Sequence, residues 1–192
     1  MNIYIIGLII IFSIIGLISL QSYQKRNSET SQSTNKSKLA ENPYNKLRNI
    51  AINMTLDQLQ LKSESADEVY GIIMDWNMGN TVATVVAYKS GDASLYLSSG
   101  QVFIGGYAHE TVVNASNEFI KLGNQNFTKA KKTDKIEPTN EDKVNFYFLT
   151  ESGRYYIEED NAKIDDNSSE LIDLFYAGNQ IITEYRTLTE KK

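Results

Sequence analysis

The sequence predicts an α+β domain, a five-stranded antiparallel sheet with flanking helices in the order helix-βββ-helix-ββ-helix. One N-terminal transmembrane helix and a flexible linker are predicted to precede it. Two observations carry the prediction of the domain. Residues 68–106 hold three runs of β-forming residues separated by turn residues, and residues 109–128 and 167–188 repeat apolar side chains at helical spacing. Hairpin connections between the strands favour antiparallel pairing, and the helices then cover the sheet.

The first segment, residues 3–20, is an uncharged and mostly apolar run. At 1.5 Å per residue it spans about 27 Å, which suits a hydrocarbon core of about 30 Å. A cleaved signal peptide is the alternative, but the sequence lacks both a basic n-region and a small-x-small cleavage site. We therefore expect residues 1–20 to remain as a single-pass membrane anchor.

The next segment, residues 21–42, is rich in Ser, Thr, Gln and Asn and has no periodic apolar face, which predicts a flexible linker. Lys25 and Arg26 follow the apolar run directly, whereas no basic side chain precedes it. The positive-inside rule then predicts that the C-terminal domain lies in the cytoplasm. A periplasmic or extracellular domain is the alternative, because long domains can cross a membrane regardless of such charges.

The globular domain is predicted at residues 43–192, beginning with a helix. Asn42 suits the N-cap and Pro43 the first helical position. Residues 55–58 read Thr-Leu-Asp-Gln and fit a capping box, so the helix is expected to break and restart there. The side chains expected on the buried face of the first part are Leu47, Ile50, Ala51 and Met54.

The first three strands are predicted at residues 69–76, 81–88 and 93–99. The first is apolar on both alternating faces except at Asp75, which indicates a strand covered on both sides. A second hairpin is predicted at residues 144–150 and 155–158, and the acidic residues 158–166 after it are expected to form a solvated loop. Asn167 with Glu170 is expected to cap the last helix.

Composition excludes several kinds of site. The chain has no cysteine and a single histidine, so a disulfide framework, a thiolate metal site and a multi-histidine metal site are excluded within one chain. We expect no metal and no cofactor. The first 42 residues carry four basic and two acidic side chains, a net charge of +2. The whole chain carries −5, so the rest of the chain carries −7. Such an acidic domain repels phosphate backbones and is not expected to bind nucleic acid.

The element order over residues 43–188 resembles that of small α+β modules of the profilin and roadblock/longin kind, which commonly act as interaction platforms. It differs from the roadblock order, which has two strands before the middle helix and three after it. Residues 68–106 (EVYGIIMDWNMGNTVATVVAYKSGDASLYLSSGQVFIGG) are also similar to a segment of uncharacterised bacterial membrane-anchored proteins. Neither resemblance implies any site residue.

Two candidate sites stand out. Asp75 could act as a general base, although a carboxylate at a strand end more often caps a turn. Gly105 and Gly106 precede a predicted helix, where free amides could bind an anion and His109 could donate to it, although a Gly-rich turn is more often only a tight turn. The segment matches neither a Walker loop nor G-x-G-x-x-G.

We therefore expect a membrane-tethered domain that binds a protein partner and is not an enzyme. Sensing of a small anion at residues 105–110 is the alternative. A hydrolase using Asp75, a serine (Ser98 or Ser99) and His109 is the weakest hypothesis, because no nucleophile-elbow motif surrounds either serine. Tyr147, Tyr155 and Tyr156 are expected to pack across the second hairpin or to form part of an interface.

Overall fold

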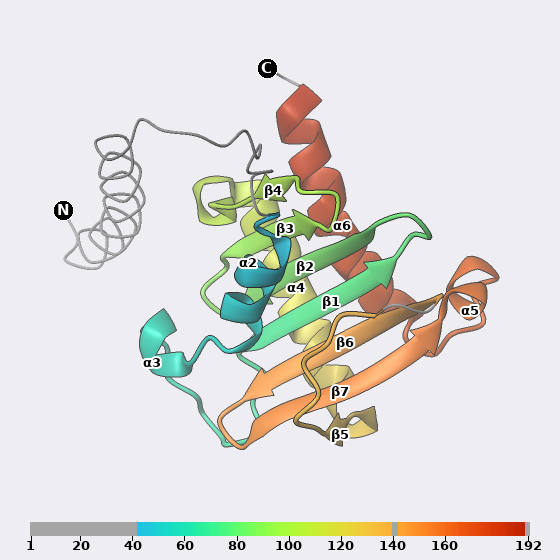
Figure 1. Ribbon diagram of the computed structural model, residues 1–192. Coiled ribbons are helices and arrows are strands. Elements are labelled where there is room, and N and C mark those ends of the chain that lie inside the picture. Colours follow the sequence, from blue (N-terminus) through green and yellow to red (C-terminus); the bar gives the residue numbers. More distant parts are fainter. Residues whose placement is uncertain (1–41, 140–141, 191–192) are drawn as a thin grey trace, which may run out of the picture. The chain divides into compact units, whose positions relative to one another are not determined.

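The computed structural model describes residues 42–139 and 142–190, and its centre is one antiparallel sheet (Figure 1). Seven strands form this sheet in the order β4-β3-β2-β1-β6-β7-β5. Five of them are long: β1 (Gly71–Asn77), β2 (Val82–Tyr88), β3 (Ala93–Leu97), β6 (Lys143–Thr150) and β7 (Gly153–Asp160). The two outermost strands, β4 (Val102–Phe103) and β5 (Lys131–Lys132), have two residues each.

The central strand is β1, which pairs with β2 on one side and with β6 on the other. Ile72, Ile73 and Met74 have no exposed surface, because helices and loops cover both faces of this strand. The near-continuous apolar sequence of β1 reflects this double coverage. The later β6–β7 hairpin thus completes a sheet begun by the β1–β2–β3 meander.

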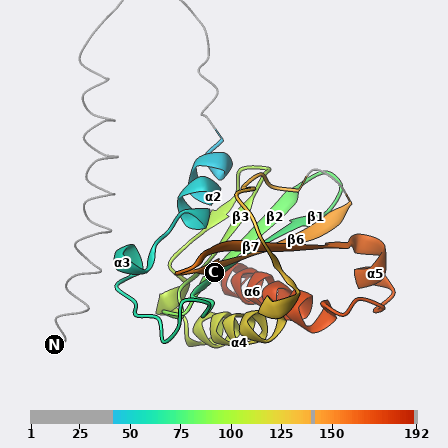
Figure 2. The ribbon, with the colours of Figure 1, turned by 90° about the horizontal axis from the view of Figure 1, so that it is seen from below.

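Helices cover the two faces of the sheet unequally (Figure 2). The long helices α4 (Glu110–Asn126) and α6 (Ile172–Glu190) lie together on one face, where they enclose the larger apolar core. Helix α2 (Tyr44–Ile52) lies on the opposite face over a smaller core rich in tyrosine. Two short helices, α3 (Leu56–Leu59) and α5 (Asn161–Asp165), and two 3-10 turns, η1 (Gly106–Ala108) and η2 (Phe127–Lys129), complete the described residues.

The predicted fold is wrong in the number and order of its elements. The domain is α+β, but among residues 42–139 and 142–190 the sheet has seven strands instead of five, and five helices are present instead of three. Strands β4 and β5 are too short to show an alternating pattern. Helix α5 and the end of β7 occupy residues 158–165, where a solvated acidic loop was expected.

No helix within residues 42–139 and 142–190 is long and apolar enough to cross a membrane. The transmembrane helix that the sequence predicts at residues 1–20, and all of the predicted linker except Asn42, lie outside the described residues.

The predicted helix ends were correct at one place and wrong at another. The capping box of Thr55 and Gln58 is present at the start of α3. Asn167 does not cap the last helix, because its φ of 58° places it in the left-handed region. Just before α6, the hydroxyl of Ser169 accepts a hydrogen bond from the amide of Leu171 at 3.0 Å.

Candidate functional site

A row of polar side chains crosses the middle of the sheet on the face that α2 partly covers. Asp75 of β1 lies opposite Thr84 of β2 and opposite Asn145 of β6, and Asn145 lies opposite Glu158 of β7. Side chains that are directly opposite in an antiparallel pair share a face and approach within about 5.5 Å. The register alone therefore brings four polar residues into one line across four strands.

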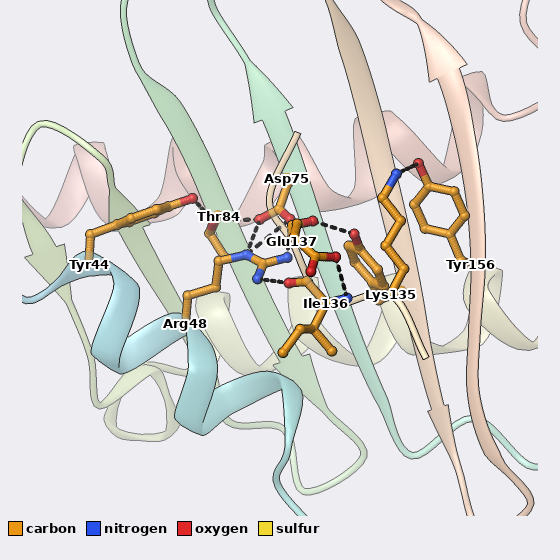
Figure 3. A network of polar contacts seen from close by, with 9 residues as sticks. Tyr44, Arg48, Asp75, Thr84, Lys135, Ile136, Glu137 and Tyr156 are labelled. Atoms are coloured by element: carbon orange, nitrogen blue, oxygen red, sulfur yellow. Dashed lines mark hydrogen bonds and ion pairs between the residues drawn. The ribbon is translucent and has the colours of Figure 1, made fainter. Parts of the chain in front are cut away.

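Arg48 from α2 neutralises the buried end of this row. Its Nε lies 3.1 Å from both carboxylate oxygens of Asp75, and its Nη2 lies 2.6 Å from Oδ2 (Figure 3). Arg48 is 4% exposed and Asp75 is 0% exposed, so the ion pair is screened from water. Burial disfavours the guanidinium charge, but the hydrogen bonds and charge of Asp75 outweigh it and raise the pKa of Arg48. Both charges are therefore fully paired.

Two hydroxyl groups extend the hydrogen-bond network around the Arg48–Asp75 ion pair. Thr84 donates to Asp75 Oδ1 at 2.5 Å, and Tyr44 then donates to the Thr84 oxygen at 2.8 Å. Burial, followed by the charge of Asp75, raises the pKa of Tyr44 to about 12. Tyr147 is affected in the same way, and its pKa is also raised to about 12. The hydroxyl groups of Tyr44 and Tyr147 therefore stay protonated at neutral pH.

A segment that we call the strap, residues 133–139, runs over β7 and β6 on the same face of the sheet as α2 (Figures 1 and 2). Two hydrogen bonds hold its backbone. Arg48 Nη1 donates to the carbonyl of Ile136, and the hydroxyl of Tyr147 donates to the carbonyl of Glu137 at 2.5 Å. The strap is therefore tied to the same ion pair that holds α2.

A cleft of about 470 Å³ opens beside the strap. This size lies within the range of small-molecule sites, about 300–1,000 Å³. Among the described residues, two lysines and two glutamates line it, so the lining is polar and carries both signs of charge. The residues that line it are Lys135, Glu137, Pro138, Thr139, Lys143, Asn145 and Glu158.

Asn145 at the base of the cleft carries a polar atom without a partner. The residue is 2% exposed, and its Oδ1 has no hydrogen-bond partner among the described residues. A buried polar atom without a partner lowers the stability of the folded protein by about 1–3 kcal/mol. A hydrogen-bond donor placed in the cleft would remove this cost.

Glu158 and Lys143 form an ion pair at the mouth of the cleft, with 2.8 Å between Nζ and Oε1. Tyr156 donates a second hydrogen bond to Glu158. These two hydrogen bonds lower the pKa of Glu158, with the Lys143 bond as the larger cause. Lys135 lies over the ring of Tyr156, 4.7 Å from its centroid. The mouth therefore presents both signs of charge close together.

Two other clefts can be compared with the strap cleft. One, of about 470 Å³, lies around Glu159, whose carboxylate is already paired with Lys163 and Ser169. The other, of about 410 Å³, includes Asn161, whose Oδ1 also lacks a partner among the described residues. Asn161 is partly exposed, however, and its amide group already donates to Asn77 and Asp142. Of these three clefts, only the strap cleft is lined by a buried side chain, Asn145, that has an unpaired polar atom among the described residues.

The residues predicted from the sequence do not form one site. Asp75 lies within β1, which continues to Asn77, and Asn77 rather than Asp75 accepts the turn hydrogen bond from Gly79, at 2.8 Å. The side chain of Asp75 points to the α2 face. His109 immediately precedes α4, which covers the opposite face. A hydrolytic site that uses Asp75 and His109 would therefore have to act through the sheet.

At the glycine turn, residues 105–110, a side chain of the protein itself already binds a backbone amide. Asp92 accepts a hydrogen bond from the amide of Tyr107 at 3.3 Å, so a carboxylate lies where an anion would bind. Gly105 adopts a left-handed φ of 82°, and Gly106 packs tightly against Val112 and the carbonyl of Ala93. His109 is exposed and makes no side-chain cap for α4. The turn serves as a tight connection into α4.

Sequence reasoning missed Arg48, Asn145 and Glu158. One signal was available for Arg48, because a carboxylate inside an apolar strand requires a cation, and Arg48 follows Tyr44 by one helical turn. For Asn145 and Glu158 the decisive fact is the pairing register, which the sequence does not show. Comparisons of the chain with protein-family models, with curated proteins and with solved structures gave no match. The geometry of the site therefore carries the functional argument.

The site can recognise a molecule through hydrogen bonds and through charges of both signs. Asp75 has no free lone pair directed at the cleft, because Arg48 and Thr84 occupy both of its oxygens. Within residues 42–139 and 142–190, no three or more His, Asp or Glu side chains are grouped to hold a metal ion. The charged groups that line the cleft are reachable from solvent, as a binding site requires.

Proposed function

We propose that this domain is a non-enzymatic binding domain that takes a small polar molecule in the strap cleft. One observation carries the proposal: the Oδ1 atom of Asn145 is buried at the base of a polar cleft without a hydrogen-bond partner among the described residues. A bound molecule with an N–H or O–H group would supply that partner. Binding would then remove the free-energy penalty that the unpaired atom causes in the ligand-free protein.

The surroundings of the cleft support recognition more than catalysis. A general base needs a lone pair that faces the substrate, and a nucleophile needs an adjacent base. Asp75 is closed off by Arg48, and Glu158 is paired with Lys143 and Tyr156. The rigid sheet and the strap instead hold the polar groups in fixed positions, which lowers the entropy cost of binding.

Thermal unfolding with a panel of small polar molecules tests this function. The panel contains L-alanyl-L-alanine, glucose, inorganic phosphate and putrescine, one member for each class of charge. A ligand at about 100 times its dissociation constant adds about 2.7 kcal/mol to the stability of the protein. We expect at least one class to stabilise the wild type and to have no effect on Asn145→Leu. If every class acts equally on both proteins, the cleft is not a binding site.

A second function, binding of a protein partner, is favoured by an apolar patch at the β4 edge of the sheet. Ile104 is 57% exposed and Tyr107 is 49% exposed, next to the partly exposed Val102 and Phe103 of β4. Exposed apolar residues beside a sheet edge are a common feature of interaction sites. This proposal keeps the interaction function that the sequence led us to expect.

Affinity capture with the full chain tests the second function. We expect the double variant Ile104→Ser/Tyr107→Ser to lose a specific partner that the wild type retains. Tyr176→Ser is the matched control, because Tyr176 is similarly exposed but lies on α6. An identical set of captured proteins for the wild type and both variants would exclude the β4 edge as an interaction site.

A further inference from the structure

Resting on the proposed binding function of the strap cleft, we infer that its ligand is a small zwitterion, an amino acid or short peptide with a free ammonium and a free carboxylate. Asn145 and the four charged side chains around it carry the inference.

The charges of the lining require a ligand that carries both signs. Among the described residues of the lining, Lys135 and Lys143 are positive and Glu137 and Glu158 are negative, so both signs of charge are present. A polyanion would be repelled by the two carboxylates, and a polycation by the two ammonium groups. Like charges brought together at a binding surface repel each other and disfavour binding. A ligand of zero net charge with separated charges avoids both penalties.

The ion pair at the mouth of the cleft makes this requirement stricter. Lys143 Nζ and Glu158 Oε1 are 2.8 Å apart, and both side chains are partly exposed. A molecule that enters beside them must compete with this pair. A ligand with only one charge can interact with only one side chain of this pair, whereas a zwitterion can interact with both at once.

Asn145 fixes the orientation of the ligand. Its unpaired Oδ1 accepts hydrogen bonds only, so the ligand must direct a donor at the base of the cleft. An ammonium or a peptide N–H meets this need, and a carboxylate does not. The ligand's carboxylate is then directed toward Lys135 or Lys143.

A neutral polyol is the closest competitor, because its hydroxyl groups could also donate to Asn145. Such a molecule would displace water from the four charged side chains but would place no opposite charge beside them. Because hydrogen bonds with charged partners are about twice as strong as those between neutral groups, the zwitterion is favoured. The cleft thus discriminates by charge as well as by hydrogen bonding.

Calorimetric titration of the full chain with three related peptides tests the inference. The probes are L-alanyl-L-alanine, its N-acetyl derivative and its C-terminal amide, which remove one charge at a time. We expect each blocked peptide to bind at least 10-fold more weakly than the free dipeptide. Glu158→Gln is also expected to weaken binding of the free dipeptide at least 10-fold. Glu118→Gln, which opens an exposed Lys–Glu pair on α4, should leave binding unchanged.

Each other outcome has a definite meaning. Equal binding of the free and blocked dipeptides would overturn the zwitterion. Binding of glucose, phosphate or putrescine that is lost in Asn145→Leu, without binding of the dipeptide, would leave the binding function intact and overturn the ligand class. If none of these probes distinguishes the wild type from Asn145→Leu, the binding function itself fails as well.

Discussion

At the scale of single residues, Asp75 shows how a carboxylate is kept inside an apolar strand. Its two oxygens receive hydrogen bonds from Arg48 and Thr84, and no part of the residue is exposed. A buried ion pair contributes little net stability compared with apolar residues of the same size, but removal of one partner leaves an unpaired charge. The Arg48–Asp75 pair therefore specifies where α2 docks on the sheet.

The first prediction concerns this pair. Arg48→Met should lower the free energy of unfolding by about 3–5 kcal/mol, because the charge of Asp75 is left buried without a counter-ion. The double variant Arg48→Met/Asp75→Leu should recover most of that loss. Urea unfolding of the wild type and of both variants measures these differences. A double variant as unstable as the single one would show that packing, and not charge, holds α2.

The second prediction concerns Asn145. Asn145→Leu should raise the free energy of unfolding of the ligand-free protein by about 1 kcal/mol, since an unpaired buried acceptor is removed. Asn124→Leu is the matched control. Asn124 has partners at both ends of its amide, including the amide of Val69 at 3.0 Å, so its replacement should destabilise the protein by about 1 kcal/mol. Loss of stability in both variants would mean that Oδ1 of Asn145 is satisfied in solution.

The third prediction follows from the buried tyrosines. The pKa values of Tyr44 and Tyr147 are raised to about 12 by burial and by the charge of Asp75, whereas an unfolded tyrosine titrates near about 10. The unfolded chain therefore releases these protons first as the pH rises, so stability falls between about pH 10 and 12. Urea unfolding across this range measures the slope. Tyr147→Phe should reduce the slope, and an unchanged slope would contradict the pKa assignment.

At the scale of elements, close approach between helices and sheet sets the position of α4 and α6. A Cβ atom on Gly123 of α4 would lie 2.0 Å from Cδ1 of Ile72, and one on Gly178 of α6 would lie 2.7 Å from the sulfur of Met74. Glycine costs a helix about 1 kcal/mol relative to alanine. Both glycines therefore stay in the helices because the sheet leaves no room for a side chain.

The fourth prediction compares these two glycines. Gly123→Ala should lower the free energy of unfolding by about 1–3 kcal/mol, because the stiff, β-branched Ile72 must shift. Gly178→Ala should cost less, because Met74 has a flexible side chain that can turn away. Thermal unfolding of both variants gives the comparison. Equal or reversed costs would contradict this account of the packing.

The same elements show what the sequence could predict. The long strands β1, β2, β3 and β6 are recognisable as runs of β-forming residues between turns, and α4 and α6 repeat apolar side chains at helical spacing. Helix α2 was predicted with Ile50 inside, yet Ile50 is 49% exposed and Arg48 is buried in its place. Apolar periodicity cannot identify a buried arginine. The short strands β4 and β5 lack any signal of their own, and their pairing depends on the neighbouring strands.

At the scale of the whole molecule, the two faces of the sheet have different roles. The α4–α6 face is closed by a continuous apolar core, whereas the opposite face carries α2, the strap and the polar row. Only Asp75 of that row could be suspected from the sequence, as a polar residue within an apolar run. Asn145 and Glu158 lie 70 and 83 positions further along the chain. Their meeting depends on how the second hairpin pairs with β1.

The most direct test of the binding cleft is the ¹H–¹⁵N spectrum of the labelled full chain during titration with L-alanyl-L-alanine, glucose, phosphate and putrescine in turn. With at least one of these probes, we predict saturable shifts of the Asn145 side-chain amide and of the backbone amides of Lys143 and Glu158. The Asn124 side-chain amide, on α4 at the opposite face, should stay in place. An Asn145 amide that none of the four probes shifts, or shifts spread equally over both side chains, would contradict the proposal that this cleft binds small polar molecules.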